Sequence, residues 1–165
     1  MHNWTLTEKI RRTIAKFGGF YAIRLFWKIS KHKKSRARAI ILNHDKNQIL
    51  LVKNITYKQF HLPGGGIEKG ESGEYAVTRE IKEELGIDIS ILYQLGKYKY
   101  NDTDKHVEVF VAHANTMNFQ MQWELDRAEW FSFNNLPDLR KNTKQALRDF
   151  LAHNEPVIGI WGLDD

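Results

Sequence analysis

The chain has 165 residues, is 42% hydrophobic, contains no cysteine and carries a formal net charge of +5. This size and apolar content suffice for one domain with a substantial core, and the lack of cysteine excludes disulfides. The best apolar run, residues 18–27, is interrupted by Arg24, and no segment resembles a signal-peptide cleavage site. A transmembrane helix is therefore not expected, and the sequence favours a cytoplasmic location.

Positive charge is concentrated at the N-terminus. Residues 1–38 contain 11 Lys or Arg and one acid, Glu8, which gives a net charge of +10. The remaining residues contain 14 Lys or Arg and 19 acids, which gives −5. We therefore expect a basic N-terminal extension, residues 1–35, followed by a main domain, residues 36–165, that is acidic overall.

The extension is predicted to be helical. Thr5 and Glu8 fit a capping box, apolar residues follow at helical spacing, and a glycine pair at 18–19 separates a second, aromatic-rich segment. Interleaved basic residues leave three roles open: a helix docked on this domain or on a second subunit, a membrane-surface anchor, or a nucleic-acid contact. We favour the docked helix, because amphipathic helices mostly bury their apolar face against protein.

From residue 37 the pattern changes to strands. Residues 39–42 and 48–53 are short aliphatic runs, and the turn-forming residues 44–47 join them, so a hairpin is predicted. After a loop at 54–58, residues 60–62 lead into Pro63. We expect His61 to be a structural residue rather than a ligand.

Residues 64–87 form the most informative segment. A glycine-rich turn, Gly64–Gly66, precedes Ser72, the expected N-cap of a helix that runs to Leu85 and ends at Gly86. Glycines without side chains let the backbone, and a carbonyl oxygen in particular, approach an ion or phosphate closely.

Three acids crowd one face of this helix near its C-terminal end, namely Glu80, Glu83 and Glu84. Like charges at these spacings cost about 0.2 to 0.5 kcal/mol per pair, and anions near a helix C-terminus oppose the macrodipole. A run of glutamates is usually only a solvated face. A hard divalent cation would offset the repulsion, because Mg²⁺ takes oxygen ligands and is held by one or two carboxylates plus substrate phosphates.

The spacing of these residues decides between the two interpretations. Gly65 is followed after five residues by Glu71, and after seven more by the run from Arg79 to Ile87. This pattern resembles the complete Nudix box of the Nudix hydrolase family, with every fixed position filled. Further similarity to the family lies upstream and downstream, at Leu62, Pro63, Gly64, Trp130, Phe131, Leu136 and Pro137, so that the resemblance covers roughly residues 36–150.

The rest of the chain is predicted to form several strands followed by one helix. Extended segments are predicted at 89–95 and 97–100 on either side of Gly96, at 106–114, at 119–125 and at 130–133, with a polar turn at 101–104. A last helix is predicted over residues 142–153, with Ala146, Leu147, Phe150 and Leu151 on its apolar side. These elements fit an α/β/α sandwich around a mixed sheet, which is also the fold that the resemblance implies.

The resemblance also implies a reaction. Nudix enzymes hydrolyse a nucleoside diphosphate linked to another moiety, and they require Mg²⁺ or Mn²⁺. Such metals bridge phosphate oxygens, neutralise developing charge and lower the pKa of a bound water. The implied ligands are Glu80 and Glu84, with Glu83 directly or through water, and the carbonyl of Gly64.

Other residues receive supporting or catalytic roles from the same resemblance. Glu71 and Arg79 form an ion pair that ties the loop to the helix, and together with Gly65 they support the site. Glu80 and Glu83 are the candidate catalytic residues, with Glu80 preferred as general base. Glu124 is the alternative base and a candidate additional metal ligand, because it lies six residues before Trp130.

The substrate is less well determined than the reaction. Asn154 begins the segment NEPVI, which resembles the base-reading segment of mutator-type 8-oxo-dGTP diphosphatases. A nucleotide-type substrate is expected, and a nucleotide with an oxidised base is one option. A homodimer is a further option, because dimers are common in the family. The alternative function is a non-catalytic module of the same fold that binds a nucleotide or RNA, although three mutually repelling acids favour the enzyme.

Overall fold

The computed structural model describes residues 35–55, 58–99, 105–122 and 125–154. The predictions for the N-terminal extension, the polar turn at 101–104, Glu124 and residues 155–158 lie outside these ranges. None of the described helices is long and apolar enough to cross a membrane.

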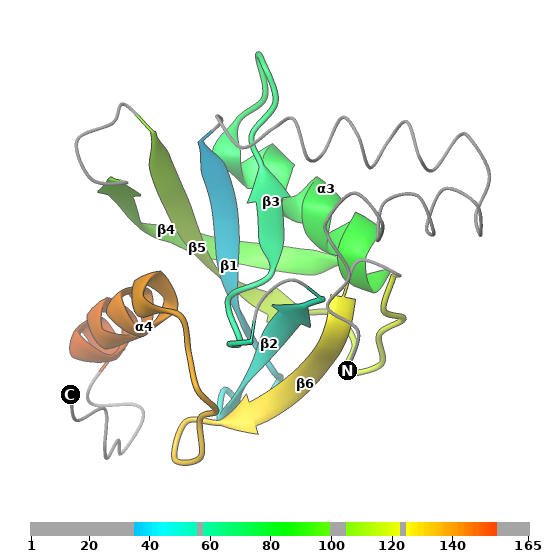
Figure 1. The fold of residues 1–165 in the computed structure, drawn as a ribbon, viewed down its shortest axis with the longest axis vertical. Coiled ribbons are helices and arrows are strands. Elements are labelled where there is room, and N and C mark those ends of the chain that lie inside the picture. Colours follow the sequence, from blue (N-terminus) through cyan, green and yellow to red (C-terminus); the bar gives the residue numbers. More distant parts are fainter. Residues whose placement is uncertain (1–34, 56–57, 100–104, 123–124, 155–165) are drawn as a thin grey trace, which may run out of the picture. The chain divides into compact units, whose positions relative to one another are not determined.

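The described residues form a six-stranded mixed sheet (Figure 1) in the order β4-β5-β1-β2-β6, with β3 paired to β1. β1 runs parallel to β5, whereas its pairings with β2 and β3 are antiparallel. The strands are β1 (Arg36–Leu42), β2 (Gln48–Asn54), β3 (Gly64–Gly66), β4 (Ile89–Lys99), β5 (His106–Ala114) and β6 (Leu125–Ser132).

Two helices, α3 (Gly73–Leu85) and α4 (Lys141–Asn154), lie on opposite sides of the sheet (Figure 1). Side chains of β1 alternate between the two faces, as the period of a strand requires. Ala37, Ala39 and Ile41 pack in the apolar cluster of α3, whereas Ile40 and Leu42 pack in the cluster that includes α4. The predicted α/β/α sandwich is confirmed.

The ends of α3 follow the sequence prediction. Ser72 Oγ accepts a hydrogen bond from the backbone N–H of Tyr75 at 3.2 Å. Gly86 has φ 70°, and its N–H donates to the carbonyl of Lys82. This is the left-handed cap that glycine takes without steric cost.

The glycine-rich segment differs from the prediction, because Gly64–Gly66 is a short strand rather than a turn. β2 pairs with β1 only at Ile41 and Leu42, so the first half of β1 has a side that β2 does not cover. β3 pairs with β1 there, opposite Arg36–Arg38. This pairing satisfies backbone groups that would otherwise be buried without partners.

Two further differences concern strand boundaries. The two segments predicted around Gly96 form one strand, β4, whose register with β5 shifts at two places, next to Tyr93 and next to Gly96. A bulge of this kind lets one strand continue past a glycine.

The strand predicted at 119–125 is also corrected. Residues 119–122 do not form a strand, and the N–H groups of Gln120 and Gln122 cap α3 by donating to the carbonyls of Leu85 and Glu84, each at 2.9 Å. These carbonyls have no partner within the helix, so an irregular segment stabilises its end. β6 then starts at Leu125 rather than at Trp130 and pairs with β2.

His61 is buried between β2 and the start of β3. Its Nδ1 lies 2.9 Å from the carbonyl oxygen of Leu62, and its Nε2 contacts Asn54 Oδ1. Burial, followed by the positive charge of Arg38, lowers the pKa of His61 to about 3. The imidazole is therefore neutral in the folded protein at neutral pH.

His61 should make folding stability depend on pH. Between the folded pKa of about 3 and the ordinary value of 6.5, the unfolded chain binds a proton at this position that the folded chain does not. Stability should therefore fall on acidification through this window by up to about 1.4 kcal/mol per pH unit. In urea unfolding at several pH values, His61→Gln should flatten the dependence, whereas His44→Gln, at a fully exposed side chain, should not. An unchanged slope in His61→Gln would contradict this account.

Candidate active site on α3 and β3

α3 carries the three predicted acids to the sheet, but it does not bury them equally. Glu80 is 2% exposed and Glu84 is 5% exposed, whereas the side chain of Glu83 is 32% exposed. Burying a carboxylate is costly unless it is paired, hydrogen-bonded or bound to a metal. Glu80 and Glu84 are therefore the residues for which the fold must provide partners.

Arg79 contacts three acids of this site, Glu71, Glu80 and Glu83. Its guanidinium binds Glu71 through two hydrogen bonds, Nε to Oε1 at 2.7 Å and Nη2 to Oε2 at 3.0 Å. Nη1 also donates to Glu80 Oε1 at 2.9 Å and lies 3.6 Å from Glu83 Oε2. The hydrogen bond to Glu71 raises the pKa of Arg79, so the guanidinium stays charged.

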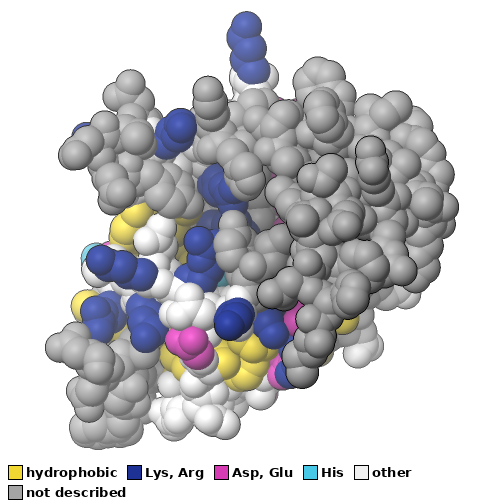
Figure 2. Space-filling view, in the orientation of Figure 1, with side chains coloured by type: hydrophobic (Ala, Val, Ile, Leu, Met, Phe, Trp, Pro, Cys, Tyr) yellow, Lys and Arg dark blue, Asp and Glu magenta, His cyan; other side chains and the backbone are white. Residues whose placement is uncertain are grey.

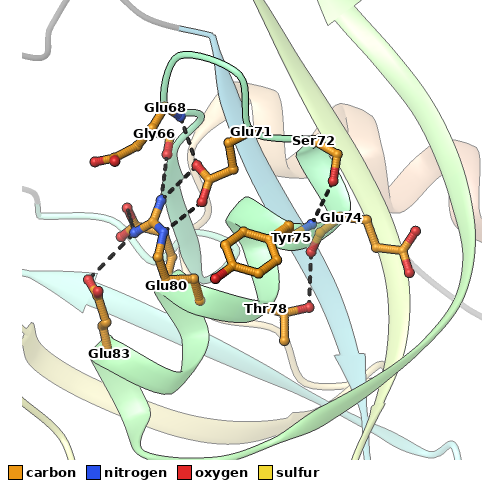
Figure 3. Close-up of polar contacts among 10 residues, drawn as sticks. Gly66, Glu68, Glu71, Ser72, Glu74, Tyr75, Thr78, Glu80 and Glu83 are labelled. Carbon is orange, nitrogen blue, oxygen red and sulfur yellow. Dashed lines mark hydrogen bonds and ion pairs between the residues drawn. The ribbon is translucent and has the colours of Figure 1, made fainter.

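The same guanidinium connects three segments of the chain. Arg79 is on α3, Glu71 is in the preceding loop, and Nη2 also donates to the carbonyl of Gly66 on β3 at 3.2 Å. Glu71 in turn accepts from the backbone N–H of Glu68 at 2.8 Å, which closes the loop (Figure 3). The ion pair expected between Glu71 and Arg79 is thus present.

The glycines of β3 bring backbone close to the buried acids. A Cβ on Gly65 would overlap the carboxylate of Glu80, so only glycine leaves room for that carboxylate in its observed position. The N–H of Gly64 donates to Glu84 Oε2 at 3.1 Å. Gly64 has φ 119°, and a Cβ there would overlap the carbonyl oxygen of Ala37. The close approach of β3 to β1 therefore requires glycine at position 64, whereas a side chain at position 65 would have to displace the carboxylate of Glu80.

The predicted carbonyl ligand has a partner of its own. Arg38 Nη1 donates to the carbonyl oxygen of Gly64 and, at 3.1 Å, to that of Leu62. The sequence interpretation did not identify Arg38. The strand period gives a signal in hindsight, because Arg36 and Arg38 alternate with the apolar residues of β1 that face α3.

The donor set fits a hard cation. Glu80, Glu83, Glu84 and the Gly64 carbonyl offer only oxygen atoms, which Mg²⁺ and Mn²⁺ prefer. Within the ranges that the structure describes, no three acidic or histidine side chains converge as a preformed metal site. Arg79 and the Gly64 N–H hold the carboxylates in this arrangement, so binding a cation would exchange some of these contacts.

Two other predicted residues cannot be placed in the site. Glu124 lies outside the described residues. Asn154 is the last residue of α4, and only its backbone is described.

The contact between Gly65 and Glu80 can be tested by substitution. Gly65→Ala should keep the fold, because the terminal carboxylate can move, but it should displace Glu80. If Glu80 is a metal ligand, Mn²⁺ affinity measured by electron paramagnetic resonance should fall by roughly 10- to 100-fold. The matched control is Gly66→Ala, since no atom lies within 4 Å of a Cβ at Gly66. Wild-type Mn²⁺ affinity in Gly65→Ala would remove Glu80 from the metal site.

The chain was compared with known proteins. The ADP-ribose pyrophosphatase of Methanocaldococcus jannaschii is 38% identical over 112 residues, which cover 64% of this chain and 66% of that protein. The 8-oxo-dGTP diphosphatase of Escherichia coli is 29% identical over 132 residues, which cover 76% of this chain and 95% of that protein. This chain thus spans slightly less than two thirds of the archaeal relative.

The fold and the family model agree with these relatives. A solved structure of an ADP-ribose pyrophosphatase from Streptococcus suis matches with a TM-score of 0.61 and 25% identity, covering 78% of this chain and 96% of the other. A family model described as the NUDIX domain matches residues 33–153, which is most of the chain and includes every described element of the sheet. The chain therefore belongs to the Nudix hydrolase family.

Proposed function

We propose that this protein is a Mg²⁺-dependent pyrophosphohydrolase that cleaves a diphosphate bond in a nucleotide-type substrate. The observation that carries the proposal is the pair of buried carboxylates, Glu80 and Glu84, held against the glycines of β3. A fold that only needed stability would gain by replacing buried charges with apolar side chains. Mn²⁺ fits the same oxygen ligands.

The acids and Arg79 have different proposed roles. Glu80 and Glu84 would hold the cation, with Glu83 and the Gly64 carbonyl completing its surroundings. When bound, the cation supplies charge neutralisation on the phosphates and lowers the pKa of its bound water. Arg79 and Glu71 would keep the carboxylates in register without touching the substrate, because their hydrogen bonds join the loop to the helix.

Burial differs between Glu80, the expected general base, and Glu83, the other candidate catalytic residue. Glu80 is enclosed by Arg79 and Gly65, which suits a ligand better than a group that must reach a water. Glu83 is the more exposed of the two and makes the longer contact with Arg79, so it is better placed to accept a proton. Both remain candidates in this proposal, and so does Glu124.

The identity of the nucleotide is a narrower proposal. The names of the relatives include both ADP-ribose and 8-oxo-dGTP, which differ in base and in number of phosphates. The NEPVI segment favours an oxidised nucleoside triphosphate, because it resembles the base-reading segment of 8-oxo-dGTP diphosphatases. Its first residue, Asn154, is the last residue of α4. Its side-chain amide could donate to and accept from a purine edge.

The reaction is tested by a hydrolysis screen with Mg²⁺. The panel contains nucleoside triphosphates including 8-oxo-dGTP, ADP-ribose, nucleotide sugars, dinucleoside polyphosphates and triphosphorylated RNA. Glu84→Gln should lower kcat by about 100-fold or more, because it removes a ligand charge in an isosteric side chain. Glu74→Gln, at an exposed acid in the first turn of α3, should retain activity.

Two results would contradict the proposal. Near-normal turnover by Glu84→Gln would remove Glu84 from the metal site. If the wild-type protein hydrolysed no substrate in the panel but still bound nucleotide, the result would favour the non-catalytic module.

The base-reading role of Asn154 has its own test. Asn154→Ala should raise KM for 8-oxo-dGTP by about tenfold, the effect of one lost hydrogen bond to a buried partner, and leave ADP-ribose unaffected. Steady-state kinetics on the two substrates measure this difference. An unchanged preference between them would exclude Asn154 from base recognition.

A further inference from the structure

The backbone groups of Gly64 are not used by the strand ladder. Gly64 lies opposite Arg38 in the antiparallel pairing of β3 with β1, and the ladder hydrogen bond beside it runs from the N–H of Ala39 to the carbonyl of Pro63, at 3.1 Å. Hydrogen-bonded and non-hydrogen-bonded pairs alternate along an antiparallel ladder. Gly64 and Arg38 therefore form a non-hydrogen-bonded pair, and the N–H and carbonyl of Gly64 point away from β1.

Side chains from two elements bind these groups instead. The N–H of Gly64 donates to Glu84 Oε2 at 3.1 Å, and its carbonyl accepts from Arg38 Nη1. Gly64 is buried, so both contacts satisfy backbone groups that would be costly to leave without partners. The carbonyl oxygen expected to ligate a cation is thus bound to a positive charge of the chain itself.

Arg38 has a second acceptor close to the first. Its Nη1 also donates to the carbonyl of Leu62, at 3.1 Å. One nitrogen therefore serves the carbonyls on both sides of Pro63. The guanidinium can release Gly64 and still keep a hydrogen bond to Leu62.

The charge of Arg38 belongs to a positive region of the domain. Burial is the main cause of the low pKa of His61, and the charges of Arg38, Arg140 and Arg36 lower this pKa further, so the three guanidiniums act on one region. Figure 2 shows Lys and Arg side chains gathered on this side of the domain. Like charges repel, so this positive potential disfavours a second cation. The effect of Arg38 on the Gly64 carbonyl is the most direct, because its guanidinium contacts that oxygen and stays charged at any pH of interest.

We propose that Arg38 competes with the divalent cation for the carbonyl oxygen of Gly64 and thereby sets the affinity of the site for that cation. The guanidinium has to release this oxygen before the oxygen can ligate a cation. The proposal rests on the proposed function, because it takes the Gly64 carbonyl as a ligand. Arg38 is then a residue that tunes the metal site without being one of its ligands.

The test measures Mn²⁺ binding to the full-length protein by electron paramagnetic resonance, without nucleotide. Arg38→Met removes the charge and keeps an unbranched side chain, so it should raise the Mn²⁺ affinity about tenfold, the effect of one charge-assisted hydrogen bond. Arg38→Gln is also neutral and retains a donor. It should raise the affinity too, and it decides the question if Arg38→Met does not fold. Arg38→Lys keeps the charge and should bind Mn²⁺ about as the wild type does.

The matched control is Arg36→Met. Arg36 is half-buried like Arg38, lies two residues earlier on β1 and is opposite Gly66 rather than Gly64. Its substitution removes the same charge from the same strand but leaves the contact between Arg38 and Gly64 in place. The Mn²⁺ affinity should therefore change much less than in Arg38→Met.

Three results would overturn the proposal. Unchanged Mn²⁺ affinity in the neutral Arg38 variants would show that the guanidinium does not compete for the oxygen. Lower affinity would make Arg38 a residue that orients the carbonyl for the cation. An equal increase in Arg36→Met and Arg38→Met would assign the effect to charge in general rather than to the contact with Gly64.

Glu84→Gln separates this proposal from the proposed function. If Glu84→Gln lowers the Mn²⁺ affinity and the neutral Arg38 variants leave it unchanged, only the role of Arg38 fails. If none of these substitutions changes the affinity, the ion binds elsewhere, and the metal site of the proposed function fails as well. The expected affinities in a protein that hydrolyses no substrate of the panel would support the role of Arg38 and overturn the hydrolase instead.

Discussion

The candidate site depends on the hydrogen bonds and ion pairs that the guanidinium of Arg79 makes. It binds both carboxylate oxygens of Glu71 and also contacts Gly66, Glu80 and Glu83. Helix, loop and strand meet at this one side chain. Without it, acids drawn together by the fold would face one another in a partly buried setting, where unpaired charge is costly. The planar fork of arginine matters, since lysine could not bind Glu71 through two parallel hydrogen bonds.

A strong apolar anchor compensates for these acids. Ala76, Val77, Ile81 and Leu85 are fully buried on the side of α3 that faces the sheet. Glu80 and Glu84 are buried on the same side of the helix as these apolar residues, so the apolar contacts offset charges that disfavour the local structure. Such conflicts between local stability and the observed residue are expected at functional sites and are offset elsewhere in the fold. The backbone caps from Gln120 and Gln122 stabilise the same end of the helix at which the acids gather.

β1 separates two regions of opposite charge. Ala37, Ala39 and Ile41 pack in the apolar cluster of α3, whereas Arg38 lines a cavity on the face of the sheet that α4 covers. Gly64 touches both regions, because its N–H donates to Glu84 and its carbonyl accepts from Arg38.

The sequence by itself determined the features that depend on neighbours along the chain. The limits of α3 follow from Ser72 and Gly86, and the buried side of α4 follows from the spacing of Ala146, Leu147, Phe150 and Leu151. The spacing from Gly65 through Glu71 to the run Arg79–Ile87 indicated the family, because this spacing is read along the chain without knowledge of distant segments.

Only the tertiary structure decided the features that depend on residues far apart in sequence. Gly64–Gly66 became a strand because the first half of β1 needed a backbone partner, and β4 continued past Gly96 because β5 pairs with it on both sides of the bulge. Arg38, Tyr98 and Arg140 are unremarked in the sequence, yet they line one cavity. Local patterns record hydrogen bonds and side-chain spacing within an element, whereas strand pairing and cavities arise only when separate elements pack together.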